Sequence, residues 1–137
     1  MFKKILIANR GEIAVRIIRA CKELGIKSVA IHSDVDTDAM HVKLADESVC
    51  VGGALPNLSY LNIPNIMSAI NITGADAVHP GYGFLSENDK FAEILIKHDV
   101  KFIGPSSKSI LALGNKSNAL KLAHEYNLPI LGNKDAK

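Results

Sequence analysis

The stretch KILIANRGEIAVRIIRACKELG, from Lys4 to Gly25, decides the fold class. It opens on a short apolar run, 5–8, of the kind found in strands that are buried on both faces of a parallel sheet. From Gly11 the apolar residues recur at steps of three and four, which predicts a helix, and Gly25 is a residue type that commonly ends one. A buried strand followed at once by such a helix is the start of a βαβ unit.

The same alternation continues along the chain. Further strands are expected at 28–31, 48–51, 75–78 and 101–103, with helices at 40–44, 63–72 and 89–98. Strands that alternate with helices of this length indicate right-handed crossovers and a parallel sheet. The expected fold class is therefore α/β, with a Rossmann-like open parallel sheet. After Pro105 two helical stretches are expected, at 108–113 and 116–126, without a further strand–helix unit.

Composition is typical of a soluble globular domain. Of the 137 residues, 47% are hydrophobic and 22% are charged, which suffices for one core. The basic residues are scattered and the formal net charge is only +2, which argues against a nucleic-acid surface. No apolar stretch reaches the ~18 residues that a membrane-spanning helix needs. Cys21 and Cys50 lack CxxC spacing, and we interpret both as buried thiols in a reducing compartment, the cytoplasm by default.

The turn between the first strand and the first helix argues against a dinucleotide site. A G-x-G-x-x-G turn lets the backbone approach a pyrophosphate closely, whereas this turn, 9–12, has the single glycine Gly11. A nucleotide-dependent oxidoreductase is therefore a poor hypothesis.

No metal site is predicted. Three aspartates at alternate positions in 34–38 resemble the start of a calcium loop, but Ala39 stands where that loop needs glycine. A solvated loop is the favoured interpretation, and the five histidines are too dispersed to form a cluster.

A second candidate site is the glycine-bearing loop that follows the fourth strand, 79–88. Ser86 and Asp89 have the spacing of a capping box, which predicts a helix N-terminus there. Helix starts favour anions, and two glycines let such a loop fold tightly over a ligand. The residues alone do not separate a ligand-binding loop from an ordinary turn whose aromatic residues enter the core. The glycines are Gly81 and Gly83, and the aromatic residues are Tyr82 and Phe84.

The first helix also carries a charged face. Glu12 and Arg16 form one i,i+4 pair, Arg19 and Glu23 form another, and Arg16, Arg19 and Glu23 cluster on the polar side. From spacing alone, a solvated face is favoured over an interface with a partner subunit.

Several of these segments together resemble the biotin carboxylase family. The similarity extends from about Phe2 to Pro129, and its motifs agree in order and spacing. The segments that carry it are 7–14, 44–47, 59–61, 79–88 and 102–105.

The resemblance implies a pre-ATP-grasp domain over 1–113 and the start of a truncated ATP-grasp region over 114–137. In this family ATP and bicarbonate give carboxyphosphate, and the carboxyl group then passes to biotin on a carrier protein. Magnesium bridges the phosphates during this transfer. The implied partners are the biotin carboxyl carrier protein and the carboxyltransferase.

The resemblance also implies roles for individual residues. Lys116 matches the lysine that contacts the ATP phosphates, a role that suits a compact ammonium charge. The loop 81–88 is expected to border the active site, with Tyr82 near the biotin pocket. The active-site loop residues are Gly81, Gly83, Glu87 and Asn88, and those of the homodimer contact on the first helix are Arg16, Arg19 and Glu23.

Two departures from the family pattern are visible. Asn115 stands where the family usually has aspartate, so a charge beside Lys116 is lost. After Pro129 the segment 130–132 differs from the family's V-P-G turn.

The main hypothesis is that the chain is the N-terminal part of a biotin carboxylase and is inactive alone. This follows because no metal-binding carboxylates, glycine-rich phosphate loop or bicarbonate-handling residues of the family are found in the sequence. The alternative is an assembly or dimerisation module that docks to a separate ATP-grasp chain. The sequence does not discriminate between acetyl-CoA, propionyl-CoA and pyruvate carboxylases as the parent enzyme.

Overall fold

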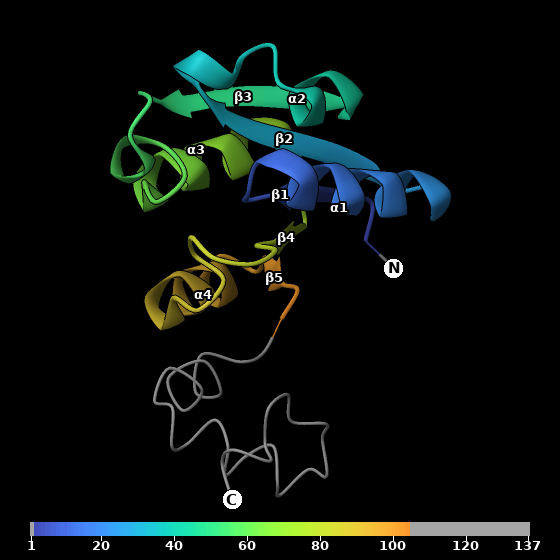
Figure 1. Ribbon diagram of the computed structural model, residues 1–137. Coiled ribbons are helices and arrows are strands. Elements are labelled where there is room, and N and C mark those ends of the chain that lie inside the picture. Colours follow the sequence, from blue (N-terminus) through green and yellow to red (C-terminus); the bar gives the residue numbers. More distant parts are fainter. Residues whose placement is uncertain (1, 105–137) are drawn as a thin grey trace, which may run out of the picture.

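The computed structural model describes residues 2–104, which form a five-stranded parallel sheet with helices on both faces (Figure 1). The predicted α/β class is confirmed, and every strand and helix expected before Gly104 is present with ends that shift by one or two residues. The region 114–137 and Lys116 lie outside the described residues, as do both helices expected after Pro105. The strands are β1 (Lys4–Ile7), β2 (Lys27–Ser33), β3 (Glu47–Gly52), β4 (Ala77–His79) and β5 (Lys101–Phe102). The helices are α1 (Gly11–Glu23), α2 (Met40–Leu44), α3 (Ile63–Thr73) and α4 (Asp89–Lys97), with 3-10 turns η1 (Asp34–Asp36) and η2 (Pro56–Leu58).

The strand order in the sheet is β3-β2-β1-β4-β5, and all neighbouring strands pair in parallel. The chain moves from β1 outward to β3 and then returns to the other side of β1 to add β4 and β5. The direction of winding therefore reverses between β1 and β4, where Leu6 is in register with Val78. In open parallel sheets, ligands bind outside the carboxyl ends of the strands at such a reversal. The topology directs attention to the residues that follow β1 and β4.

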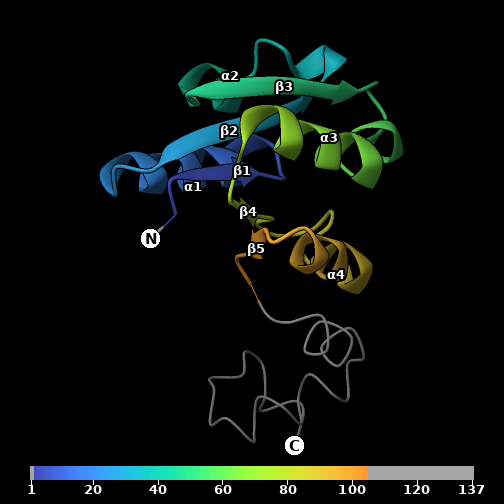
Figure 2. The same cartoon turned by 180° about the vertical axis from the view of Figure 1, so that it is seen from behind.

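Two helical layers enclose the sheet. Helices α1 and α2 lie on one face, and α3 and α4 lie on the other, as the two opposite views show (Figures 1 and 2). The largest apolar cluster includes Leu6, Ile31 and Val78 from the strands and Phe91 from α4, all of them buried. A smaller cluster under α1 contains Ile7, Ala14 and Ile18. Because residues 5–7 of β1 are buried on both faces of the sheet, their side chains are apolar without alternation, as the sequence predicted.

The helix ends follow local sequence signals, with one exception. Gly25 lies directly after the C-cap of α1 with φ +72°, and Gly74 caps α3 in the left-handed conformation, both as expected for glycine. The capping box predicted at Ser86 is wrong: the N-cap of α4 is Asn88, whose Oδ1 accepts a hydrogen bond from the Phe91 amide at 2.8 Å. A turn occupies the residues around Ser86, so the helix begins two residues later than that cap requires.

The cysteines differ from expectation in one position. Cys21 is on the buried face of α1 and Cys50 is exposed on β3, and both are free thiols. The prediction of two buried thiols is therefore wrong for Cys50, because β3 is an edge strand with alternate residues turned outward. Within residues 2–104, no helix has the length and apolar character that a membrane crossing requires.

Candidate functional site at the carboxyl edge of the sheet

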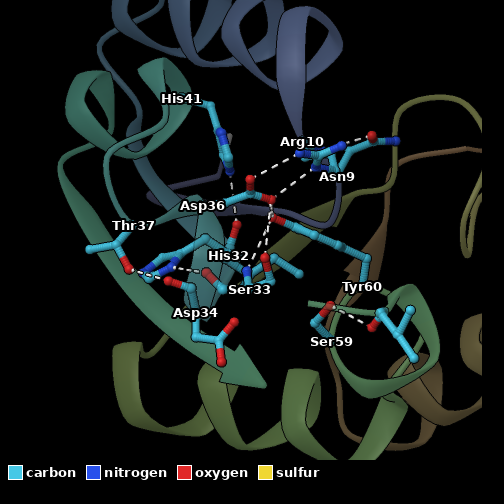
Figure 3. A network of polar contacts seen from close by, with 12 residues as sticks. Asn9, Arg10, His32, Ser33, Asp34, Asp36, Thr37, His41, Ser59 and Tyr60 are labelled. Atoms are coloured by element: carbon cyan, nitrogen blue, oxygen red, sulfur yellow. Dashed lines mark hydrogen bonds and ion pairs between the residues drawn. The ribbon is translucent and has the colours of Figure 1, made fainter. Parts of the chain in front are cut away.

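A polar cluster joins the carboxyl ends of three strands (Figure 3). Arg10 follows β1, and Asp36 follows β2. Arg10 Nε donates to Asp36 Oδ2 at 2.9 Å, and Arg10 Nη2 donates to Asp36 Oδ1 at 2.9 Å. Tyr60, after β3, donates its hydroxyl to Asp36 Oδ2 at 2.6 Å and accepts the Ser33 amide at 3.1 Å. Ser33 Oγ adds a further hydrogen bond to Asp36 Oδ2 at 3.1 Å. The carboxylate thus ties β1, β2 and β3 together at one edge.

The electrostatics of Asp36 follow from these partners. Its side chain is 13% exposed, and the hydrogen bonds from Arg10 are the main reason that its pKa falls from 3.8 to about 2. The hydrogen bonds from Tyr60 and Ser33 lower the pKa further, against the opposing effect of desolvation. The Arg10 guanidinium also lies over the Tyr60 ring, 5.7 Å from its centroid. The cluster is an ion pair in which the Asp36 carboxylate offsets the charge of the Arg10 guanidinium.

The expectation of a solvated loop at 34–38 is therefore wrong for Asp36, although Asp34 and Asp38 are exposed. The alternating aspartates do not converge, because only Asp36 turns toward the sheet edge. Across residues 2–104, no group of three or more His, Cys, Asp or Glu side chains is arranged to hold a metal ion.

The second part of the site joins the ends of β1 and β4. The Asn9 side chain is buried, and its Nδ2 donates to the carbonyl oxygens of Pro80 at 2.7 Å and Tyr82 at 2.6 Å. Its Oδ1 accepts the Arg10 amide at 2.8 Å. The first turn, in which a dinucleotide-binding protein would have small residues, is thus filled by a carboxamide that holds the neighbouring loop.

Gly81 fits closely against this turn. A Cβ at this position would lie 2.6 Å from Ile13 Cγ2 and 2.9 Å from Asn9 Nδ2, and φ is +63°. Its amide donates to His79 Nδ1 at 3.1 Å, so His79 carries its proton on Nε2. Burial lowers the pKa of His79 and favours this neutral form.

The two aromatic residues of the loop have different environments. Tyr82 is 76% exposed, whereas Phe84 is half-buried with its ring centroid 5.3 Å from that of Tyr60. The ordinary-turn interpretation, with both rings in the core, is therefore wrong for Tyr82. Phe84 adopts φ +45°, which is rare for a bulky residue and is maintained here by packing on Tyr60. Glu87 is exposed just before α4, and Asn88 caps that helix.

An apolar groove of about 610 Å³ runs beside α1. Tyr82 and His79 line it near the carboxyl edge, Arg16 lines it from α1, and Leu24 and Phe2 line it toward the opposite edge. The groove therefore extends from the glycine loop to Arg16, one residue of the charged face of the first helix.

The charged face of α1 is solvent-exposed. Arg16, Arg19 and Glu23 are all exposed, and Arg16 Nε lies 3.9 Å from Glu12 Oε1, so the first predicted i,i+4 pair is present as a loose contact. The second predicted pair, between Arg19 and Glu23, is not formed in the described part of the chain. The face is free to make contacts outside the domain.

Sequence reasoning singled out the loop 81–88 but missed the residues that hold it. Asn9 lies in the turn 9–12, of which only the single glycine entered the prediction, although a polar residue directly after a buried strand signals a functional edge. Asp36 and Tyr60 were not connected, because they are far apart in sequence and meet only through the strand order.

This chain is similar to known proteins over most of its length. Residues 1–110 match the family described as "Biotin carboxylase, N-terminal domain". The biotin carboxylase of Nostoc sp. is 56% identical over 128 residues, which cover 93% of this chain and 29% of that protein. The mitochondrial propionyl-CoA carboxylase alpha chain of Homo sapiens is 62% identical over 122 residues, which cover 89% of this chain and 17% of that protein.

A solved structure agrees with the fold. The biotin carboxylase domain dimer of the Hydrogenobacter thermophilus 2-oxoglutarate carboxylase, in complex with MgADP, ADP and bicarbonate, superposes with a TM-score of 0.84. The two are 46% identical, and the match covers 94% of this chain and 28% of that chain. The chain thus spans less than a third of the length of each of these proteins.

Proposed function

Because this chain belongs to the biotin carboxylase family, through that family's N-terminal domain, we propose that it contributes one wall of an ATP-dependent biotin carboxylase active site. The complete enzyme uses ATP and bicarbonate to carboxylate biotin on a carrier protein, by way of carboxyphosphate. The chain itself supplies the pre-ATP-grasp domain over 1–113 and the beginning of the ATP-grasp region over 114–137.

The observation that carries this proposal is the placement of the loop 81–88. The loop lies at the reversal point of the sheet, beside the end of β1, where open α/β proteins bind ligands. It presents Tyr82 to solvent on a backbone that is hydrogen-bonded to Asn9. An exposed aromatic ring on an anchored loop at this edge of the sheet supports a role in contacting a ligand.

Tyr82 is the proposed contact for biotin. Its ring offers an apolar face and a hydroxyl, which suit a ligand with an apolar body and polar edges. Gly81 and Gly83 allow close approach to the backbone, and the exposed Glu87 and the capping residue Asn88 complete the border of the site.

ATP and magnesium belong to the complete site. Bound there, ATP supplies the phosphoryl group that activates bicarbonate, and magnesium neutralises the phosphate charge. Lys116 is the residue proposed to contact the ATP phosphates. The ADP, magnesium and bicarbonate present in the Hydrogenobacter relative support this ligand set. Residues 2–104 offer no three-residue group of metal-ligating side chains, so we assign no magnesium ligand to them.

A direct test is to incubate the chain with ATP, magnesium, bicarbonate and biotin and to measure ADP release. We expect no turnover above the background, since this sequence lacks the family's metal-binding carboxylates. Sustained ADP release at an enzyme-like rate would contradict the proposal that the chain is only part of the site.

A second candidate function is assembly. Arg16, Arg19 and Glu23 are exposed on α1. Arg16 lines the apolar groove, and the Hydrogenobacter relative is a dimer. We therefore propose a homodimer contact through α1 in the complete enzyme. Sedimentation of the chain and of Arg19→Glu tests it: the variant should shift the equilibrium toward monomer, and a monomer unaffected by this change counts against the α1 contact.

The family membership, rather than the geometry of the site, supports the proposals for the parent enzyme and its partners. The biotin carboxyl carrier protein and a carboxyltransferase would receive the carboxyl group, and the cytoplasm is the proposed location. The relatives include biotin carboxylases and propionyl-CoA carboxylase chains, so the acceptor of the carboxyl group stays open.

A further inference from the structure

We infer that Asn9 is a positioning residue that sets the conformation of the loop 81–83 before any ligand binds. That this loop serves biotin rests on the proposed function, whereas the positioning itself rests on the contacts of Asn9.

Both the donor and the acceptor of the Asn9 carboxamide form hydrogen bonds. Its Nδ2 carries two hydrogens and meets two carbonyl oxygens, those of Pro80 and Tyr82, while Oδ1 accepts the Arg10 amide. Aspartate has the same shape but no donor, so it would turn both loop contacts into repulsions between oxygens. Asparagine is therefore the side chain that this junction of β1 and the loop requires.

The two carbonyl oxygens belong to different peptide groups, one between Pro80 and Gly81 and the other between Tyr82 and Gly83. The peptide between Pro80 and Gly81 is held at both ends, because its oxygen accepts from Asn9 and its N–H donates to His79 Nδ1 at 3.1 Å. The peptide that follows Tyr82 is held at its oxygen by the same carboxamide. A single buried side chain thus fixes the backbone before and after the residue that carries the exposed ring.

The loop needs such an anchor because its own backbone is not self-supporting. Gly81, Gly83 and Phe84 all have positive φ values, of +63°, +73° and +45°. Phe84 is supported by its packing on Tyr60. The two glycines adopt positive φ without strain, but their freedom leaves the loop backbone unfixed. The Tyr82 side chain is 76% exposed and cannot supply that support, so its direction depends on the backbone contacts. Positioning by Asn9 leaves the Tyr82 ring free for a ligand.

The test uses NMR spectroscopy of the 137-residue chain without ligand. In the unchanged chain, both Asn9 Nδ2 protons should show couplings across hydrogen bonds to the carbonyl carbons of Pro80 and Tyr82. They should also exchange with solvent at least about tenfold more slowly than the side-chain protons of the exposed Asn57. Equal exchange at the two asparagines, with no coupling, would overturn the inference without any variant.

Two variants address the consequence for the loop. In Asn9→Ala and in Asn9→Asp at neutral pH, the Gly81 amide should exchange roughly tenfold to a hundredfold faster relative to the Leu6 amide of the core. The Leu6 amide reports global opening, so an acceleration at Gly81 that exceeds the one at Leu6 is local to the loop. The control is Asn62→Ala, which deletes an asparagine cap from α3 and should not raise the ratio.

An unchanged Gly81 ratio in a folded Asn9 variant would contradict positioning. If either variant fails to fold, the measurement on the unchanged chain still decides. None of these readouts requires biotin or ATP, so failure of the proposed function would leave their outcome intact, and the reverse also holds.

Discussion

The carboxylate of Asp36 should control the stability of the carboxyl edge of the sheet, and Asp36→Asn is the perturbation that reveals it. The variant keeps the shape of the side chain but removes the charge that two Arg10 nitrogens, the Tyr60 hydroxyl and Ser33 Oγ contact. An amide cannot accept all of these hydrogen bonds, and its NH₂ group would face the guanidinium.

The magnitude follows from the pKa of Asp36. A fall from 3.8 to about 2 corresponds to roughly 2.5 kcal/mol of folding free energy at neutral pH. Arg10 is half exposed, and solvent screening reduces the expected effect to about 1–2 kcal/mol. Because the folded-state pKa is depressed, this contribution is present above about pH 4 and disappears as pH falls toward 2.

The assay is urea denaturation followed by circular dichroism at pH 7, 5, 3.5 and 2.5. Asp36→Asn should be less stable than the unchanged chain by about 1–2 kcal/mol at pH 7, and the difference should shrink toward pH 2.5. The matched control is Asp38→Asn, an exposed carboxylate of the same loop, which should change stability by less than about 0.5 kcal/mol. A stability difference for Asp36→Asn that is absent at pH 7, or constant across the pH range, would show that the Asp36 carboxylate does not stabilise this edge.

Three further predictions concern single side chains. Gly81→Ala should destabilise the domain by about 2 kcal/mol in urea denaturation, since its Cβ meets Ile13 and its φ is +63°; a neutral result would contradict the close packing. His41 is buried, its Nε2 lies 3.0 Å from the Ile31 carbonyl oxygen, and burial lowers its pKa from 6.5. The folded chain therefore resists the proton that the unfolded chain binds, and stability should fall as pH drops through about 6.5; His41→Leu should reduce that slope between pH 7.5 and 5.5, and an undiminished slope would assign it to other groups. Asn88→Ala should lower the free energy of unfolding by about 1 kcal/mol, measured by thermal or urea denaturation, because it removes the cap of α4. An equal loss in Ser86→Ala would instead support the capping box predicted at Ser86.

Sequence patterns predicted the elements well because the relevant forces are local. The apolar run at 5–8 and the helical period after Gly11 both reflect which faces are buried, and burial dictates periodicity. Gly25 ends α1 as expected, because a residue without Cβ adopts the left-handed conformation at little cost. These features need no knowledge of strand order.

The features that sequence patterns missed depend on strand order. Once β1 lies between β2 and β4, Arg10 can reach Asp36 on one side while Asn9 reaches Pro80 on the other. The exposure of Cys50 likewise follows from β3 being an edge strand, a fact that its own residues do not reveal. The site was thus predictable as a loop, and its anchoring residues were not.

The aromatic residues of the loop show a similar division. From sequence, Tyr82 and Phe84 were equivalent rings between or beside glycines. The two rings differ in exposure because Phe84 packs on Tyr60, whereas Tyr82 is exposed to solvent. The family resemblance had placed Tyr82 at the ligand side, and its exposure is consistent with that role.

We propose that this chain forms the N-terminal wall of a biotin carboxylase site. The direct test is a chimera in which this chain replaces the corresponding residues of the Nostoc biotin carboxylase, to which it is 56% identical. The measurement is carboxylation of free biotin that depends on ATP and bicarbonate. We predict turnover within about tenfold of the parent enzyme, with a further loss of at least about tenfold in Tyr82→Ala and little change in Tyr82→Phe. A folded chimera without turnover, or one indifferent to Tyr82→Ala, would contradict the account.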